Sequence, residues 1–204
     1  MPNPQCRLSR FCYDKDVVDS ERFPRALARI DAANALDPFG RELIYSQRMT
    51  DWLHRVAPDA SEPLRLAARA QHIMRWKIPR SDYPMDRAGY HRWRTRLYDF
   101  HADATAEILR EVGYDDATIA RVRSLIRKER IKSDLEMQTL EDVICLVFLE
   151  NYFTDFAREK DEEKLLNIIR RTWAKMSTKG HEMAMTIQYS PQDLTIIRKA
   201  LASK

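Results

Sequence analysis

The sequence contains little glycine, with four glycines in 204 residues. Glycine adopts the positive φ angles of tight hairpin turns more readily than any other residue, so its scarcity disfavours folds that are rich in β-hairpins. The abundant residues, alanine, leucine, arginine, glutamate and lysine, favour helices. No internal repeat and no strand-rich segment can be recognised. We therefore expect an all-α protein.

The sequence also lacks an apolar run of about 18 residues or more, the length that a membrane-spanning helix needs. Its first residues, MPNPQCRLSRFCYDKD, contain no apolar stretch of the kind found in a secretion signal. The three cysteines, Cys6, Cys12 and Cys145, have no metal-type spacing, and Cys145 lies in an apolar run that predicts a buried thiol. We expect a protein of the reducing cytoplasm that has no membrane partner.

The net charge of +4 and the isoelectric point near 9.0 are compatible with an anionic ligand, although many enzymes share such values. The length allows one domain with a sizeable core. We expect an irregular segment over 1–19, which has two prolines and no apolar period, followed by a single compact helical domain over 20–204. The oligomeric state cannot be predicted from these features.

Apolar spacing and capping residues predict about seven or eight helices. Ser20 and Ser61 stand where they can cap the first and third helices, Asp115 can cap the fifth, and Gly113 can end the fourth. The stretch IPRSDYPMDRAG over 78–89 contains two prolines and a glycine and predicts a loop. The expected helices cover 21–36, 41–56, 63–77, 90–112, 116–130, 135–158, 161–177 and a last segment that begins after Ser190.

Three polar residues lie on apolar faces of separate expected helices. Asp142 has Cys145, Leu146 and Leu149 as its helical neighbours, and an unpaired buried carboxylate is so costly that it needs a cation, a metal or several donors. His72 and His101 also face partly apolar surroundings. Imidazole and carboxylate groups could together bind one divalent metal, such as Mn, Fe, Co, Ni or Zn. Hydrogen-bonded core histidines, and an arginine partner for Asp142, remain the simpler alternatives.

Four stretches resemble the HD-domain phosphohydrolases over about 41–150, with further helices over 151–204. They are YSQRMTDWL (45–53), LAARAQHIMRW (66–76), HADATAEILREVGYDDATIARVRSLI (101–126) and EMQTLEDVICL (136–146). The resemblance implies an HD-like helical fold, and it places His72 and Asp142 at metal-ligand positions. It also implies a metal-bound water that attacks a phosphoester.

The chain also departs from the HD pattern at several positions. Tyr45 stands at the position of the first histidine ligand, Ile73 replaces the aspartate of the HD pair, and Lys128 and Glu129 replace another frequent histidine. The whole chain also resembles an uncharacterised family of bacterial and fungal proteins. The stretches that carry this second likeness are IDAANALDP, RAQHIMRWKIPRSDYPMDRAGYHRWR and LEDVICLVFLENYFTDF.

Residues 64–98 hold nine basic side chains, eight of them arginines, interleaved with aromatic residues. Arginine suits bidentate phosphate binding and aromatic rings can stack on nucleobases, so this segment predicts a phosphate or nucleotide site. A solvated basic face, with the tryptophans in the core, is the alternative. The candidate ligand-binding residues are Arg75, Arg80, Arg87, Arg92, Trp76 and Tyr83.

Three functions are compatible with these patterns. The first is a degenerate HD-like protein that binds a nucleotide or RNA through the arginine and aromatic loop. The second is a metal-dependent phosphohydrolase, in which His72, His101 and Asp142 bind the metal and Glu141 or Glu129 acts as base. The third is a structural or interaction protein in which all these side chains are satisfied locally.

Overall fold

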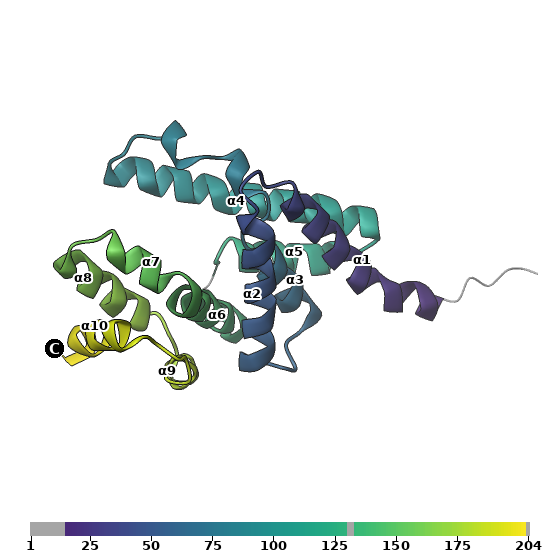
Figure 1. Ribbon diagram of the computed structural model, residues 1–204. Coiled ribbons are helices and arrows are strands. Elements are labelled where there is room, and N and C mark those ends of the chain that lie inside the picture. Colours follow the sequence, from purple (N-terminus) through teal and green to yellow (C-terminus); the bar gives the residue numbers. More distant parts are fainter. Residues whose placement is uncertain (1–14, 130–132, 203–204) are drawn as a thin grey trace, which may run out of the picture.

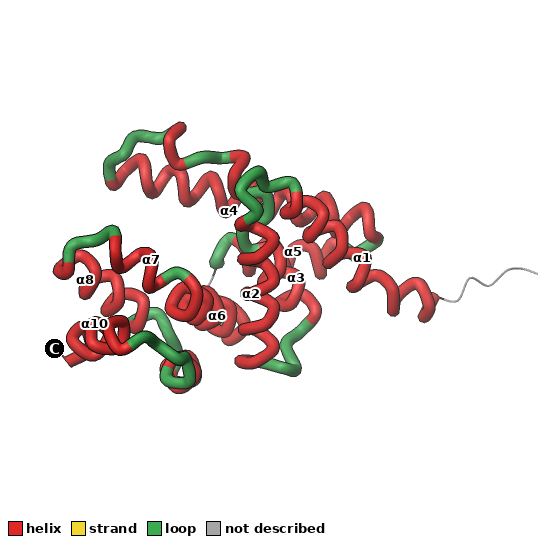
Figure 2. The backbone as a smooth tube through the Cα atoms, in the orientation of Figure 1, coloured by secondary structure: helices red, strands yellow, loops and turns green. Residues whose placement is uncertain are grey.

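The computed structural model describes the backbone of residues 15–129 and 133–202, and side chains from residue 21 onward. Within these ranges the protein is helical and contains no strand, which confirms the expected all-α class (Figure 2). The described residues form ten α-helices and two short 3₁₀-helices, more than the seven or eight expected. None of these helices is both long and apolar enough to cross a bilayer.

Figure 1 labels the α-helices in chain order. They are α1 (Lys15–Ala35), α2 (Arg41–Val56), α3 (Glu62–Ala70), α4 (Arg87–Val112), α5 (Asp116–Ile126), α6 (Leu135–Asn151), α7 (Phe153–Arg158), α8 (Glu162–Trp173), α9 (Thr178–Ala184) and α10 (Pro191–Ala202). The two 3₁₀-helices, η1 (Arg75–Lys77) and η2 (Arg80–Asp82), lie between α3 and α4.

Three of the expected helix boundaries are confirmed by capping geometry. The Ser61 hydroxyl accepts a hydrogen bond from the Leu64 amide at 3.3 Å, and the Asp115 carboxylate accepts one from the Thr118 amide at 2.8 Å. Gly113 ends α4 with a φ of 95°, a left-handed conformation that favours glycine. Ser61 and Asp115 therefore fix where α3 and α5 begin, and Gly113 fixes where α4 ends.

Several boundaries differ from the expected ones. Helix α1 begins at Lys15, so the irregular segment expected over 1–19 extends too far, while residues 1–14 lie outside the described residues. The helix expected over 135–158 is divided at Tyr152, whose φ of −128° leaves the helical range and separates α6 from α7. A further helix, α9, follows Ser177, which caps it by accepting from the Gly180 amide.

His72 does not lie on a helix, in contrast to the expected helix over 63–77. Helix α3 ends at Ala70, and a turn over 71–74 leads into η1. Met74 adopts a left-handed conformation with a φ of 50°, which a helix cannot contain. The Asn34 side chain fixes this turn by accepting a hydrogen bond from the Met74 amide at 3.0 Å. The turn buries Ile73 completely and leaves His72 beside it, partly exposed.

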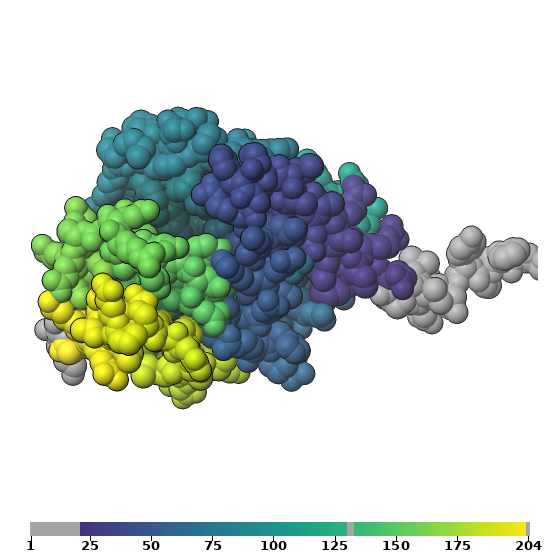
Figure 3. Space-filling view, in the orientation of Figure 1, coloured from purple at the N-terminus to yellow at the C-terminus, as the bar shows by residue number. Residues whose placement is uncertain are grey.

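The hydrophobic core has a larger and a smaller part. The larger part joins α1–α6 and α9, and the smaller part, which contains Phe153, Leu165 and Ile197, joins α7, α8 and α10. Figure 1 shows α7, α8 and α10 gathered on one side of α6 and α1, α2, α3 and α5 on the other, while α4 runs across the top of the view above both groups. In the space-filling view the surface is hollowed where α4 and its preceding loop, in blue-teal, meet the green residues of α6 and α7 (Figure 3).

Candidate functional site

Three adjoining cavities form one cleft between α2, α4 and α6, and we name them by the side chains that line them. The aromatic chamber, of about 410 Å³, is lined by Glu42, Tyr45, Phe148 and Tyr152. The middle chamber, of about 180 Å³, contains both predicted histidines, His72 and His101. The basic chamber, of about 750 Å³, is lined by Lys128, Glu141 and Lys175.

Shared side chains set the order of the chambers. The aromatic and middle chambers have His72, Arg75 and Ile144 in common. The middle and basic chambers share Arg94, Tyr98 and Lys128, whereas the aromatic and basic chambers share no lining residue. The cleft is therefore a row, with the histidines at its centre and an arginine at each junction.

The two histidines meet in the middle chamber. The His72 ring stacks on the Tyr45 ring, with centroids 4.0 Å apart and planes 10° from parallel. The His101 ring is tilted against His72 at a centroid distance of 6.0 Å. Nδ1 of His101 lies 2.7 Å from the Ile73 carbonyl oxygen, which can only accept, so Nδ1 carries the proton. Ile73, the residue that replaces the HD aspartate, therefore orients His101 through its backbone.

The second nitrogen of His101 has no partner. Nε2 is buried and makes no hydrogen bond with any described atom, although the residue lines the middle chamber. Because Nδ1 holds the proton, Nε2 presents a lone pair that needs a donor. Burial lowers the pKa of His101 to about 3, and burial followed by the charge of Arg75 lowers the pKa of His72 well below its usual value. Both imidazoles are therefore neutral at physiological pH.

The two arginines at the junctions are held by uncharged neighbours, although the charge of Glu42 also acts on Arg75. Arg75 approaches Nε2 of His72 at 3.3 Å and stacks over Trp93, and Arg94 bonds to the hydroxyls of Tyr90 and Tyr98. Neither guanidinium forms an ion pair with a described carboxylate. Burial lowers the pKa of Arg75, which reflects the cost of holding this charge away from water.

Lys128 brings a third cation to the cleft. Its φ of 59° is unusual for a residue with a side chain, and its Nζ lies 2.6 Å from Oε2 of Glu141. Oε1 of Glu141 lies 3.6 Å from Nζ of Lys175. Burial alone would raise the pKa of Glu141, but the two lysines outweigh it and lower that pKa. One carboxylate thus faces two ammonium groups, and the basic chamber keeps an excess of positive charge.

Glu42 provides the acidic group at the opposite end. Its side chain is 13% exposed, and Oε2 lies 3.8 Å from Nδ1 of the neutral His72. Burial raises the pKa of Glu42 to about 7, against the opposing charges of Arg75 and Arg41. No described donor forms a hydrogen bond with this carboxyl group. The aromatic chamber therefore holds a carboxyl group that titrates near neutrality.

The structure places Asp142 outside the cleft. Its carboxylate accepts hydrogen bonds from the Ser177 amide at 2.8 Å, from the Ser177 hydroxyl and from Nε2 of Gln138 at 3.1 Å. A Cβ atom on Gly180 would come within 2.7 Å of this carboxylate, so α9 packs directly on it. Asp142 thus meets several donors and anchors α9. Of the three proposed metal ligands the structure brings together His72 and His101 only, and no three described His, Cys, Asp or Glu side chains are grouped to hold a metal.

Most of the predicted loop residues lie away from the cleft. Arg75 lines it, but Arg87 and Arg92 are exposed and line none of the three chambers. Arg80 donates to the Tyr83 and Asp86 carbonyl oxygens, at 2.9 and 3.3 Å, and holds the loop in shape. Trp76 and Tyr83 are half-buried outside the chambers, and of the two candidate bases Glu141 lines the basic chamber while Glu129 is exposed.

Sequence reasoning missed Glu42 and Arg94 as site residues, and treated Lys128 only as a departure from the HD pattern. Glu42 is in the first turn of α2, where an acidic residue is common for helix stability alone. Arg94 could not be distinguished by sequence from the other eight basic residues of the segment 64–98. Tyr45 stands one helical turn after Glu42, at the position where the HD pattern has its first ligand. This position was the sequence feature that could have indicated that the first turns of α2 line the cleft.

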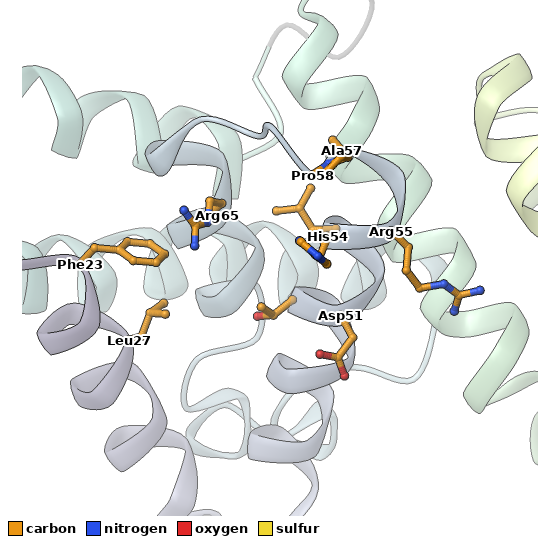
Figure 4. A pocket seen from close by; sticks show the side chains of 10 residues that line it. Phe23, Leu27, Asp51, His54, Arg55, Ala57, Pro58 and Arg65 are labelled. Atoms are coloured by element: carbon orange, nitrogen blue, oxygen red, sulfur yellow. The ribbon is translucent and has the colours of Figure 1, made fainter.

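A separate cavity of about 530 Å³ lies between α1, α2 and the start of α3 (Figure 4). Arg65 stacks over Phe23 at 4.2 Å, and Arg55 stacks over Trp52 at 3.5 Å and pairs with Glu150 at 3.4 Å. Arg55 therefore has a carboxylate partner, whereas Arg65 is stacked on an aromatic ring as Arg75 is in the cleft.

Comparison with protein families gives one match. The model of a domain of unknown function, DUF4202, matches residues 24–197. The chain belongs to this family. The match includes every helix that lines the cleft, from α2 to α6, so the cleft is contained in the family domain. Neither the curated proteins nor the solved structures include a match to the chain.

Proposed function

We propose that this DUF4202 protein binds a small phosphorylated molecule of the nucleotide class in the cleft. The observation that carries the proposal is the pair of arginines, Arg75 and Arg94, that line a concave site and form no ion pair with a described carboxylate. A buried charge is costly unless it is paired, and a phosphate supplies the missing charge together with acceptors for the guanidinium forks.

The remaining groups of the cleft support the same class of ligand. Lys128 and Lys175 extend the positive charge at one end, and Tyr45, Phe148 and Tyr152 offer aromatic surface at the other. The unpaired Nε2 of His101 needs a donor, which a fully ionised phosphate cannot provide. A ligand that combines negative charge, hydroxyl or N–H donors and a flat apolar part satisfies all three requirements.

The proposal retains an HD-like ancestry without HD chemistry. Tyr45 and Ile73 stand at two expected ligand positions, and neither offers a carboxylate or imidazole. Asp142, at a third, is engaged by Ser177. We infer a degenerate HD-like domain in which positions once used for a metal now serve ligand binding.

A thermal-shift titration tests the proposal. Pyrophosphate and a panel of nucleotides should raise the melting temperature of the wild-type protein, with an effect that grows with ligand concentration. Arg75→Met should abolish most of this stabilisation, whereas Arg92→Met, which removes an exposed arginine of the same segment, should leave it intact. Equal stabilisation of both variants, or none of the wild type, contradicts the proposal.

A metal-dependent phosphohydrolase is the second candidate, favoured by the neutral pair His72 and His101 and the free lone pair on Nε2 of His101. Elemental analysis of untagged protein decides between the two. A stoichiometric divalent metal that is lost in His72→Ala and His101→Ala, and retained in a His54→Ala control, would establish the metal site. A metal-free protein that still binds pyrophosphate favours the binding function.

A further inference from the structure

The cleft also indicates which nucleotide would bind and in which direction, an inference that rests on the proposed function. Its chambers form a row with different chemistry at each step: aromatic rings with Glu42 and Arg41 at their edge, then two neutral imidazoles, then two lysines that share one carboxylate. A nucleotide has the same sequence of parts, an aromatic base, a hydroxylated sugar and a charged tail. We propose that the cleft binds a guanine nucleotide, with the base in the aromatic chamber under Glu42 and the phosphates in the basic chamber.

The aromatic chamber fits a base in both shape and surface. Tyr45, Phe148 and Tyr152 line a cavity of about 410 Å³, and Tyr152 is only partly buried. Nucleobases stack on such rings irrespective of their identity, so stacking supplies affinity without selecting among bases. Selection therefore depends on the polar groups at the edge of this chamber.

Glu42 is the group that can select. A carboxylate only accepts hydrogen bonds, and guanine is the base whose Watson–Crick edge offers two adjacent donors, N1–H and the exocyclic amine. Adenine and cytosine place a ring-nitrogen acceptor beside their single amine, and that acceptor repels a carboxylate. Because the Glu42 carboxyl has no hydrogen-bond donor of its own among the described residues, it is available for this contact.

The middle chamber fits the sugar. Its volume of about 180 Å³ is the smallest of the three. Nε2 of His101 is one of two buried acceptors without a hydrogen bond among the residues that line this chamber, and the other is Oε1 of Gln71. A ribose hydroxyl can donate to Nε2. Arg75 and Arg94, at the two junctions, then flank the sugar, and Arg94 also lines the basic chamber, where the first phosphate lies.

The basic chamber fits the charged tail, because Lys128 and Lys175 together pair with one carboxylate, Glu141, among the residues that the structure describes. Lys175 lines this chamber and neither of the other two, and its side chain is more than half exposed. It is therefore positioned for the phosphate farthest from the sugar. The direction of binding therefore predicts that Lys175 contributes more to a nucleoside diphosphate than to a monophosphate.

Calorimetric titrations at pH 8 with GMP, IMP, AMP and pyrophosphate test the base. The wild-type protein should bind GMP about tenfold more tightly than IMP, which lacks the exocyclic amine, and more tightly still than AMP. Glu42→Gln should remove most of this preference, and it should still bind pyrophosphate, up to a few-fold more tightly because the charge that partly neutralises Arg75 is gone. Glu107→Gln, an exposed glutamate of α4 outside the cleft, is the matched control and should behave as the wild type.

A second pair of variants tests the direction. Lys175→Ala should lower the affinity for GDP about fivefold to tenfold and that for GMP by less than twofold, whereas Lys179→Ala, an exposed lysine of α9, should change neither. Equal affinity for the three monophosphates overturns the guanine assignment, and so does a Glu42→Gln variant that retains the preference for GMP. In either case, binding of pyrophosphate would still support the proposed function. An unchanged GDP to GMP ratio in Lys175→Ala overturns the direction. Absence of all binding overturns both proposals.

Discussion

Two polar clusters interrupt the apolar packing around α6, and they differ in how completely their hydrogen bonds are satisfied. Asp142 receives three hydrogen bonds, two from Ser177 and one from Gln138, and seats the start of α9 on α6. Among the described residues of the cleft, Arg75 and Arg94 form no ion pair, and Nε2 of His101 has no hydrogen bond.

The difference separates a structural role from a binding role. A buried carboxylate whose oxygens are all engaged stabilises the contact between two helices and has no capacity left for a ligand. Unpaired cations and an orphaned acceptor raise the free energy of the folded protein, and a ligand that pairs them recovers that energy on binding. The sequence pattern alone treated both clusters as candidate ligand sites.

The largest expected effect is at the satisfied cluster. Asp142→Ala leaves the Ser177 amide and hydroxyl without an acceptor and should destabilise the protein by about 3 kcal/mol. Urea denaturation measures this loss. Ser177→Ala, which removes only the hydroxyl and the cap of α9, should cost about 1 kcal/mol. A loss below 1 kcal/mol in Asp142→Ala would show that this carboxylate does not anchor α9.

Arg75→Met should have the opposite profile. The methionine side chain keeps the packing against Trp93, and the substitution removes a guanidinium charge that forms no ion pair with a described carboxylate. The free energy of unfolding should therefore change by less than about 1 kcal/mol. Affinity for pyrophosphate should fall about tenfold to a hundredfold. Denaturation and titration of the same preparation separate the two effects. Strong destabilisation without a change in affinity would remove the distinction between the clusters.

Glu42→Gln should change stability in a pH-dependent way. The pKa of Glu42 rises from 4.5 in the unfolded chain to about 7 in the folded protein, so folding takes up a proton between these values. The wild type should therefore lose on the order of 2 kcal/mol as the pH rises from 4.5 through 7, a loss that the variant avoids. The variant should be the more stable of the two at pH 8. Parallel stability curves from pH 4.5 to 8 would contradict a buried, unpaired Glu42.

Titration of Glu42 should also affect anion binding, and sulfate is a suitable probe because its charge is constant above pH 4. Ionised Glu42 partly neutralises Arg75, so wild-type affinity for sulfate should weaken modestly, by a few-fold, from pH 6 to 8. Glu42→Gln should show a flat profile over the same interval. A steeper dependence in the variant would assign the effect to another group.

The smallest effects are expected in the loop over 78–89 and the exposed face of α4. Arg87→Met and Arg92→Met remove charges that line no chamber of the cleft, so pyrophosphate affinity should change by less than about twofold at moderate salt. Titration at two salt concentrations distinguishes long-range attraction from contact. A tenfold loss of pyrophosphate affinity at both salt concentrations would show that the arginine and aromatic loop, and not the cleft, binds the phosphate.

The helices were predictable from the sequence because their causes are local. Ser61 and Asp115 bond to amides three residues ahead, and Gly113 provides the left-handed backbone that ends α4. The turn that carries His72 was not predictable. It depends on Met74 in a left-handed conformation, which is held by Asn34 from a different helix.

The site was predictable only in part, because helical periodicity identifies an apolar face but not what packs against it. His72 and His101 do meet, as the pattern suggested. Asp142 lies on α6 one residue from Glu141, about 100° around the helix, and this step directs Asp142 to α9 and Glu141 to the cleft. The pairing of Lys128 with Glu141, and the isolation of Glu42, arise from contacts between distant segments.

Titration calorimetry with pyrophosphate tests most directly whether the unpaired cations form a phosphate site. The wild-type protein should bind one pyrophosphate per chain in a saturable manner, and Asp142→Asn, if folded, should bind it with the same affinity. Combined replacement of Arg75 and Arg94 by methionine should abolish the binding heat while the protein remains folded. Undiminished pyrophosphate binding by that folded double variant would contradict the assignment of the cleft as a phosphate-binding site.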